Sequence, residues 1–351
     1  HFTILLNWKQ SAVVSKPLHI LRITPHFLRP KLAPVAYDPC GGLQVQSRRL
    51  TQALDRGTIR QTVLTSRLPG SARKENLANG TEIHSVGPVL PEWLVPWALS
   101  LTWGIAVLAQ LWRQRRTVDL IHIHLNHWLW CRILIVAART IGLPTVVKAS
   151  TDLWVAQNNR FVRHIGHWID GFALRRASHV ITLTESCARK MRFSYGFTTE
   201  QATVIPDAID LSAFCANLSP IQIEAFRQRF AIPNDRNIVL YLGRIRSEKG
   251  WQDLPDVARA LGPQDFLLIC GDGPDRAKLK TAMARACPDD RWRITGFVDQ
   301  LQARIALEVA DILILPSRRE AFGGFLLEAM ACGIPAVSYR IGGIPELAGN
   351  P

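Results

Sequence analysis

The alternation of short apolar runs with longer helix-period segments constrains the fold of this chain more than any other feature. Ten runs rich in β-branched residues recur along the 351 residues, at 18–24, 62–66, 118–125, 145–150, 179–184, 238–244, 265–271, 292–298, 311–317 and 335–340. Several are apolar at consecutive positions, as expected of strands that are buried on both faces. The alternation predicts an α/β fold in which crossover helices connect the strands of parallel sheets.

Helix periodicity and one break in the pattern indicate the domain organisation. Leu279 and Met283 lie four residues apart and share one face of a predicted crossover helix. The turn-rich stretch 204–220 interrupts the strand–helix rhythm, and a chain of 351 residues favours two domains over one. We therefore predict an α/β domain at residues 1–205 and a second one at residues 206–351.

The charge of the chain indicates anionic partners. There are 42 Lys and Arg residues against 28 Asp and Glu residues, a formal net charge of +14, and 48% of the residues are hydrophobic. The hydrophobic content excludes a disordered chain, whereas the basic excess suits phosphate-bearing ligands, acidic lipid surfaces or nucleic acid. The sequence lacks the basic stripe with interleaved aromatic residues of nucleic-acid-binding proteins, so we do not expect nucleic acid as a partner.

The seven cysteines are scattered, and none forms a C-x-x-C pair or a Cys/His cluster with zinc spacing. We interpret them as free thiols in a reducing compartment, which predicts a cytoplasmic protein. The sequence starts at His1 without a signal-peptide pattern and stops at Pro351 in a loop-like segment. From these ends we expect a fragment or a processed product.

An uncharged segment at 93–112 departs from the pattern of a soluble domain. Its twenty residues have the length of a membrane span and carry Trp at both ends. Polar residues, Pro and Gly dilute it, and predicted strands of one sheet flank it, so we expect a buried or membrane-surface helix rather than a span. The basic run 113–116 suits acidic lipid headgroups or is an ordinary solvated helix end.

Two acids surround a glycine pair near the end of the chain. Glu320 follows the predicted strand 311–317, at the carboxyl end where open parallel sheets bind ligands. Gly323 and Gly324 then begin a helix whose unpaired N–H groups can receive an anion. Glu328 lies further along this apolar helix, and its carboxylate needs a partner there, either an internal cation or a pair of ligand hydroxyls.

Two loops that follow predicted strands have features of a phosphate site. In the first, Arg244 and Lys249 can converge on one point, either as a diphosphate clamp or as a plain basic loop. In the second, Gly271 and Gly273 stand between a strand and a helix. This second loop matches a dinucleotide fingerprint only weakly, because the full G-x-G-x-x-G pattern is absent.

The first half of the chain offers two further candidates. Gly41 and Gly42 precede a predicted helix and either admit a phosphate to its start or form a helix-entry turn. His122, His124 and His127 lie at the end of a predicted strand, but no carboxylate is spaced to complete a metal site. We therefore favour one histidine at the strand end that polarises a reacting group.

Together and in this order, these segments resemble the retaining glycosyltransferases of family 4, also called glycosyl transferases group 1. The resemblance covers nearly the whole chain and is strongest from Tyr241 to Glu346, where EAFGGFLLEAMACGIPAVSYRIGGIPE matches the E-x7-E signature of the family. It implies the GT-B fold, with two Rossmann-like domains whose parallel sheets face each other across a cleft. It also implies a transferase enzyme that uses a nucleotide-sugar donor and strictly requires no metal or other cofactor.

The resemblance further implies a role for each candidate residue. Arg244 and Lys249 match the residues that neutralise the donor diphosphate. Glu328 matches the residue that binds the ribose hydroxyls, and Glu320 matches the acid near the transferred sugar. The implied catalytic residues are His124 and Glu320, and the implied donor-binding residues are Gly41, Gly42, Arg244, Lys249, Phe297, Val298, Phe322, Gly323, Gly324 and Glu328.

The resemblance leaves the sugar, the base and the acceptor open. With the basic, Trp-rich first half, it favours a lipid-linked or polysaccharide acceptor and peripheral contact with the inner face of the cell membrane. Asp207 and Ala208 stand where the family usually has Asn-Gly, and family chains continue past Glu346, so we expect an incomplete second domain. The alternative to an enzyme is a non-catalytic sugar-nucleotide-binding relative, which would bind without turnover.

Overall fold

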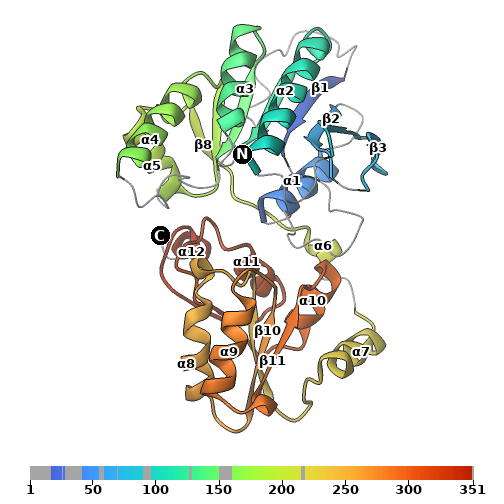
Figure 1. Ribbon diagram of the computed structural model, residues 1–351, viewed down its shortest axis with the longest axis vertical. Coiled ribbons are helices and arrows are strands. Elements are labelled where there is room, and N and C mark those ends of the chain that lie inside the picture. The colour runs from blue at the N-terminus through green and yellow to red at the C-terminus, as the bar shows by residue number, and fades with distance from the viewer. Residues whose placement is uncertain are drawn as a thin grey trace. The chain divides into compact units, whose positions relative to one another are not determined.

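The computed structural model describes residues 17–25, 27, 42–54, 59–68, 70–89, 96–125, 129–149, 160–214 and 218–349. The chain forms two compact units, the first from residues 1–181 and 192–203 and the second from residues 182–191 and 204–351. Each unit contains one sheet with helices packed against it (Figure 1). The predicted α/β class with parallel sheets is therefore confirmed.

The first unit is built on an eight-stranded sheet with the order β3-β4-β2-β1-β5-β6-β7-β8. Its strands are β1 (Leu18–Ile23), β2 (Ile59–Ser66), β3 (Lys74–Asn76), β4 (Glu82–Val86), β5 (Leu120–His124), β6 (Thr145–Ala149), β7 (His179–Thr182) and β8 (Ala202–Val204). Strand β1 pairs in parallel with β2 and β5, whereas β3 runs antiparallel to β4. The five strands predicted for this half are confirmed, and β3, β4 and β8 are additional.

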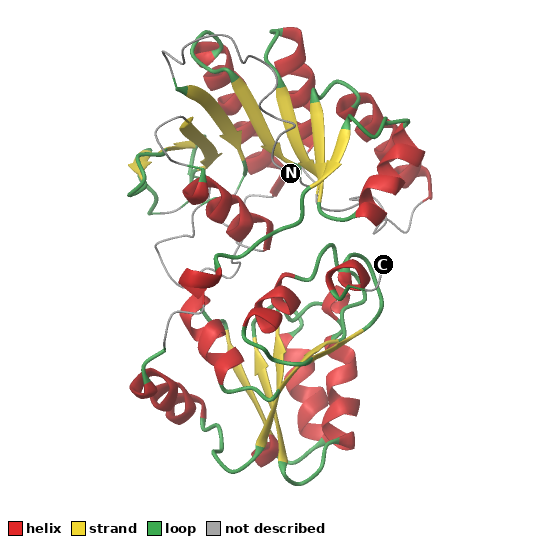
Figure 2. Cartoon of the chain, turned by 180° about the vertical axis from the view of Figure 1, so that it is seen from behind, coloured by secondary structure: helices red, strands yellow, loops and turns green. Residues whose placement is uncertain are grey.

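Four helices lie wholly within the described residues of the first unit, namely α1 (Gly42–Ala53), α2 (Pro96–Gln114), α3 (Leu129–Thr140) and α4 (Arg160–Leu174). A fifth, α5 (Glu185–Tyr195), begins in residues 182–191 of the second unit and ends in the first. Figure 1 shows α2 and α3 side by side over one face of the sheet, with α4 at the edge of the unit, and Figure 2 shows the same sheet from the other side. Helices α2 and α3 approach closely at Gly104, where a Cβ would overlap the ring of Trp130. The single hydrogen at Gly104 is what lets the two helices pack at this distance.

The uncharged segment at 93–112 contributes to α2, which is partly buried against the sheet. Trp103, Val107 and Leu111 are fully or almost fully buried along one face of the helix. Among the residues whose placement is described, no helix combines the length and the hydropathy needed to cross a bilayer. The prediction of a buried or membrane-surface helix rather than a span is consistent with this burial.

The second unit is built on a parallel sheet with the order β11-β10-β9-β12-β13. Its strands are β9 (Asn237–Leu242), β10 (Asp265–Cys270), β11 (Trp292–Gly296), β12 (Ile312–Leu315) and β13 (Ala336–Ser338). Its helices are α6 (Leu211–Phe214), α7 (Pro220–Phe230), α8 (Leu254–Ala260), α9 (Arg276–Ala286), α10 (Gln300–Glu308), α11 (Gly324–Ala331) and α12 (Ile344–Leu347). All five strands predicted for this half are confirmed.

Two hydrophobic cores cover the two faces of this second sheet, which explains its consecutive apolar residues. Leu240 of β9 and Leu268 of β10 belong to one core. Their strand neighbours Tyr241 and Ile269 belong to the other core, on the opposite face. In that second core lie the two helical residues predicted to share a face, Leu279 and Met283, and both are fully buried.

Glu346 of α12 explains why residues 182–191 belong to the second unit. Its carboxylate accepts hydrogen bonds from the backbone N–H groups of Glu185 (2.6 Å) and Ser186 (2.8 Å) at the start of α5. Those N–H groups have no partner within their own helix, and the helix start favours a negative charge. The carboxylate thus caps α5 from a position 160 residues further along the chain.

Candidate functional site

Predicted donor-binding residues and the predicted catalytic Glu320 lie at one edge of the second sheet. Strands β9, β11 and β12 run parallel within this sheet, and the loops that follow them carry Arg244 and Lys249, Phe297 and Val298, and Glu320. Because the carboxyl ends of parallel strands meet at the same edge, these loops lie where open α/β sheets bind their ligands.

Lys249 and Glu320 form an ion pair at this edge. Their Nζ and Oε2 atoms are 2.8 Å apart, and the side chains are 31% and 16% exposed. The Glu320 carboxylate also accepts a hydrogen bond from the backbone N–H of Ala321 (3.2 Å) and a long one from the hydroxyl of Ser317 (3.5 Å). Two residues separated by 71 positions are thus brought together in a partly shielded setting, where a charge interacts more strongly than in bulk water.

Backbone contacts hold the loops of Lys249 and Glu320 against each other. The carbonyl oxygen of Glu248 accepts hydrogen bonds from the N–H groups of Arg318 (2.9 Å) and Arg319 (3.1 Å). Gly250 has a φ of +70°, and a Cβ at this position would overlap the carbonyl oxygen of Pro316. The glycine that follows Lys249 is therefore required by close backbone packing as well as by its left-handed conformation.

Gly342 and Gly343 hold the other side of the Glu320 loop. A Cβ on Gly342 would overlap the carbonyl oxygen of Glu320, and a Cβ on Gly343 would crowd that of Ala321. Gly342 also has a φ of +54°. The glycine pair that precedes α12 therefore fixes the position of the Glu320 backbone, a role that the sequence analysis did not assign.

The glycines of the β10 loop serve loop packing. A Cβ on Gly271 would overlap the carbonyl oxygen of Gly243, and one on Gly273 would overlap that of Ile245. In addition, the N–H of Ile245 donates to the carbonyl oxygen of Asp272 at 2.9 Å. Gly271 and Gly273 are thus needed because the backbone of the β10 loop touches the backbone of the Arg244 loop. This contact positions the Arg244 loop.

Arg244 is half-buried, and its backbone is held by Tyr241. The carbonyl oxygen of Arg244 accepts a 2.8 Å hydrogen bond from the hydroxyl of Tyr241, whose side chain lies in the core. Burial raises the pKa of this phenol well above its ordinary value, so the hydroxyl keeps its proton and remains a donor. The strand residue thus fixes the start of the basic loop.

Asp275 is a further positioning residue that the sequence analysis missed. Its carboxylate accepts hydrogen bonds from the ammonium of Lys278 (3.0 Å), the indole N–H of Trp251 (3.1 Å) and the hydroxyl of Ser247 (3.2 Å). These bonds, that of Lys278 first, lower the pKa of Asp275 below its ordinary value. Because Ser247 and Trp251 flank Lys249, Asp275 restrains the loop that carries the lysine.

The glycine pair after Glu320 begins α11 as predicted. Gly323 has a φ of +95° and stands at the N-cap, Phe322 is buried, and Gly324 is exposed with open space around its Cα. The first N–H groups of α11 therefore start at an accessible position beside the Glu320 loop. Glu328 lies on the same helix and is half-buried, and the apolar side chains of Phe325 and Met330 on this helix are exposed.

Phe297 and Val298 follow β11 at the same edge of the sheet. Val298 packs against the core, whereas the Phe297 side chain is 49% exposed. An exposed aromatic ring at a strand end offers a stacking surface for a planar ligand group. The predicted donor-binding residues of the second unit thus lie on loops at one edge of the sheet and on α11, and their shared role in donor binding stays a prediction.

In the first unit, His124 ends β5 as predicted, but its side chain is fully buried. The guanidinium of Arg22 lies 2.6 Å from Nδ1 of His122 and 3.3 Å from Nε2 of His124, and it donates to the Gln61 carbonyl at 3.0 Å. Since an arginine only donates, both ring nitrogens accept, which places the proton of His124 on Nδ1. The expectation that His124 faces a reacting group is not met by this buried position.

Burial and charge keep these two histidines neutral. Burial, with additional contributions from Arg22 and Lys148, lowers the pKa values of His122 and His124 well below the ordinary range. Within the described part of the chain, Nδ1 of His124 has no hydrogen-bond partner. His124 is therefore suited to donate one hydrogen bond and is unsuited to act as a general acid at neutral pH.

Gly41 and His127 lie outside the described residues, whereas Gly42 is the exposed first residue of α1. Over the ranges that the structure describes, no group of three or more His, Cys, Asp or Glu side chains could hold a metal ion.

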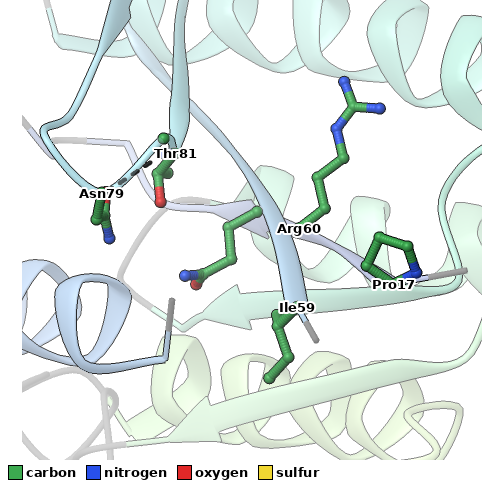
Figure 3. Close-up of a pocket in the computed structure, with 7 residues that line it drawn as sticks. Pro17, Ile59, Arg60, Asn79 and Thr81 are labelled. Carbon is green, nitrogen blue, oxygen red and sulfur yellow. Dashed lines mark hydrogen bonds between the residues drawn. The ribbon is translucent and has the colours of Figure 1, made fainter. Parts of the chain in front are cut away.

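A shallow pocket in the first unit lies away from the predicted residues. It has a volume of ≈ 290 Å³ and is lined by residues at the start of β1 and β2 and before β4, among them Pro17, Arg60 and Thr81 (Figure 3). Asn79 in its wall accepts a hydrogen bond from the backbone N–H of Thr81 (3.3 Å). The pocket is therefore at the amino ends of the strands, opposite to the edge where His124 lies.

Comparison with known proteins agrees with this arrangement. A family model described as glycosyl transferases group 1 matches residues 222–350, and a model described as a glycosyl transferase 4-like domain matches residues 41–208. The chain is 34% identical to a 2-deoxystreptamine glucosyltransferase of Streptomyces kanamyceticus, over 88% of this chain and 83% of the relative. It is 29% identical to a 2-deoxystreptamine N-acetyl-D-glucosaminyltransferase of Streptomyces fradiae, over 95% of this chain and 83% of the relative.

Solved structures show the same fold. A sucrose-phosphate synthase from Thermosynechococcus elongatus is similar with a TM-score of 0.75 and 21% identity, covering 93% of this chain and 82% of that one. The Anabaena protein HepE, solved in complex with UDP and glucose, is similar with a TM-score of 0.69 and 19% identity, covering 94% and 83%. These likenesses confirm the predicted GT-B fold.

Proposed function

This chain belongs to the glycosyl transferases of group 1, enzymes that act on sugar-nucleotide donors, and we propose that it transfers the donor sugar with retention of anomeric configuration. Retention follows the resemblance to the family, and the observation that carries the proposed donor site is the Lys249–Glu320 pair at the carboxyl edge of the second sheet. It places a cation suited to a diphosphate next to an acid suited to a sugar hydroxyl.

In this proposal the leaving nucleoside diphosphate is held by Arg244, Lys249 and the start of α11 at Gly324. Negative charge grows on the phosphate oxygens as the glycosidic bond breaks. Two cations and a helix N-terminus that are already in position stabilise this charge more in the transition state than in the ground state. The packing of Gly250 on Pro316 supports such preorganisation, because it fixes the lysine loop before the donor arrives.

The remaining residues of this edge bind the rest of the donor. Glu328, half-buried on α11, accepts hydrogen bonds from the two ribose hydroxyls, and the exposed ring of Phe297 contacts the base. Glu320 shares the Lys249 ammonium with the diphosphate and orients the sugar through its second oxygen.

We propose a lipid-linked or polysaccharide acceptor, used at the inner face of the cell membrane. The apolar and basic character of α2, with Ile105 and Trp112 exposed and Arg113 in its last turn, supports an acceptor at a lipid surface. The second candidate acceptor is an aminocyclitol, which the names of the two Streptomyces relatives favour. Turnover of a radiolabelled donor with a polyprenyl-linked sugar or with 2-deoxystreptamine distinguishes the two.

The donor proposal is tested by thermal unfolding with UDP-, GDP- and ADP-sugars. One of these donors is expected to raise the Tm, since a ligand that binds only the folded state stabilises it. The double variant Arg244→Ala/Lys249→Ala should abolish the shift. The matched control Lys280→Ala/Arg285→Ala removes two exposed cations from α9 and should retain it. A shift that survives in the first variant would show that the diphosphate binds elsewhere.

A further inference from the structure

Helix α4 carries a stripe of large apolar side chains that are exposed in the described part of the chain. Phe161, Ile165, Trp168 and Phe172 are 71%, 41%, 65% and 39% exposed. Their spacing of four, three and four residues places them on one face of the helix. The opposite face packs inward through Ala173 and Leu174, which are almost fully buried. A stripe of four large exposed side chains, two of them aromatic residues more than 60% exposed, is unusual for a surface that faces only water.

The two neighbouring helices extend this stripe into a surface. Leu101, Ile105 and Trp112 are exposed along one face of α2, and Leu129 and Ile133 along one face of α3. Helix α3 contacts both α2 and α4, and Figure 1 shows α2 and α3 side by side on one face of the sheet. We call the exposed apolar side chains of these three helices the α2–α4 surface: Leu101, Ile105, Trp112, Leu129, Ile133, Phe161, Ile165, Trp168 and Phe172.

The charges around the α2–α4 surface are of one sign. The only acid in the sequence of residues 96–116, 129–140 and 160–176 is Asp170. It is buried, and its Oδ1 lies 2.7 Å from Nε of the buried Arg132. The exposed charged side chains of these segments are therefore all basic, and they include Arg113, Arg116, Arg139, Arg160 and Arg175.

Two arginines lie directly on aromatic rings of the α2–α4 surface. The guanidinium carbon of Arg115 is 3.8 Å from the ring centroid of Trp112, and that of Arg176 is 3.6 Å from the ring centroid of Phe172. An aromatic ring with an arginine over its face combines an apolar body with a cationic group. This is the composition that prefers the boundary between lipid headgroups and acyl chains.

The charge pattern selects the occupant of the surface. A second copy of this chain would bring the same arginines face to face, and like charges at an interface oppose association. Single-stranded nucleic acid would use the aromatic rings and arginines, but it would leave the aliphatic side chains Leu101, Ile105, Ile133 and Ile165 without stacking partners. A lipid bilayer with anionic headgroups matches both the aliphatic stripes and the basic rim.

We propose that the α2–α4 surface docks this protein on anionic lipid bilayers, with the three stripes facing the acyl chains and the arginines facing the headgroups. The inference gives the membrane contact of the proposed function a defined surface, and to that extent it rests on that function. It assigns the membrane contact to three helices that lie flat on the lipid, with α4 contributing the most exposed aromatic residues.

The test measures sedimentation of the full chain with sucrose-loaded vesicles of phosphatidylglycerol and phosphatidylcholine. We expect binding to these vesicles, little binding to pure phosphatidylcholine, and weaker binding at about 0.5 M salt, because screening is stronger there. The variant Phe161→Ser/Trp168→Ser should lower the partition coefficient about 100-fold, since each buried aromatic side chain contributes about tenfold. The control Ile221→Ser changes an 80% exposed apolar residue of α7 and should bind like the wild type.

Donor binding and oligomeric state are measured on the same variants. The Phe161→Ser/Trp168→Ser variant should keep the donor-induced Tm shift, which shows that it is folded and that a loss of vesicle binding is specific. Vesicle binding equal to the wild type would overturn the docking proposal and leave the donor proposal intact. If the wild type is a dimer that this variant dissociates, the surface belongs to a second copy of the chain. If the wild type binds single-stranded DNA and not vesicles, the surface belongs to nucleic acid. If no donor raises the Tm of the wild type but the wild type still binds the vesicles, only the proposed function is refuted.

Discussion

The contact of Gly250 with Pro316 gives the most specific prediction about the donor site. Replacing Gly250 by Ala places a Cβ on a residue whose φ is +70° and drives it into the carbonyl oxygen of Pro316. The positive φ alone costs about 1–2 kcal/mol for a residue with a Cβ. To relieve the overlap, the Lys249 loop must move away from the Glu320 loop. This movement breaks the two hydrogen bonds to the Glu248 carbonyl, each contributing about 0.5–1.5 kcal/mol.

The expected loss for Gly250→Ala is therefore about 2–5 kcal/mol in the free energy of unfolding. Gly333 provides a matched control in the same unit, because it also has a φ of +70° but no atom lies within 4 Å of its ideal Cβ. Gly333→Ala should lose only the conformational cost of about 1–2 kcal/mol. The difference between the two variants isolates the packing of the two loops.

Urea denaturation followed by circular dichroism measures both losses, and donor titration of the same samples measures the functional consequence. Gly250→Ala should bind the donor more weakly than Gly333→Ala at equal fractions of folded protein, since it displaces Lys249 from Glu320. If the two variants lose the same free energy and bind the donor equally, the argument that this glycine holds the lysine loop in place is refuted.

Two further predictions concern positions outside the donor contacts. Asp275→Asn should lower the Tm at neutral pH, because the depressed pKa of Asp275 means that its bonds to Lys278 and Trp251 stabilise the folded state above the ordinary carboxyl pKa. The Tm difference from the wild type should shrink below about pH 4 and disappear below the folded-state pKa, and a difference that is constant with pH would contradict it. Gly104→Ala should destabilise the first unit by about 1–3 kcal/mol through overlap with Trp130, and the loss should be smaller in a Trp130→Leu background.

Much of the fold could be predicted from the sequence because its strands are buried on both faces. Leu240 and Tyr241 are adjacent in β9 yet enter different cores, so the strand appears as a continuous apolar run. Strand β3 was missed because its three residues, Lys74–Asn76, are polar and lie at the edge of the sheet. Such a strand is defined by its pairing with β4, which local sequence does not encode.

One part of the candidate site could be predicted from the sequence, and another part could not. Lys249 and Glu320 could be placed at one sheet edge because both follow parallel strands, and the structure brings them into contact. The roles of Gly250 and Asp275 could not be predicted, since they depend on contacts between loops that are distant in sequence. The burial of His124 was missed because its position at a strand end gave no information about Arg22, which lies 102 residues away.

The central claim is that the second unit holds a nucleoside diphosphate between Lys249 and the start of α11. A crystal structure of the protein with its bound nucleotide-sugar donor tests this most directly. We predict diphosphate oxygens within hydrogen-bonding distance of the Lys249 ammonium and of the first N–H groups of α11, with the ribose hydroxyls on the Glu328 carboxylate. A diphosphate bound at another edge of the sheet, or a Glu328 side chain that does not contact the ribose, would contradict the account.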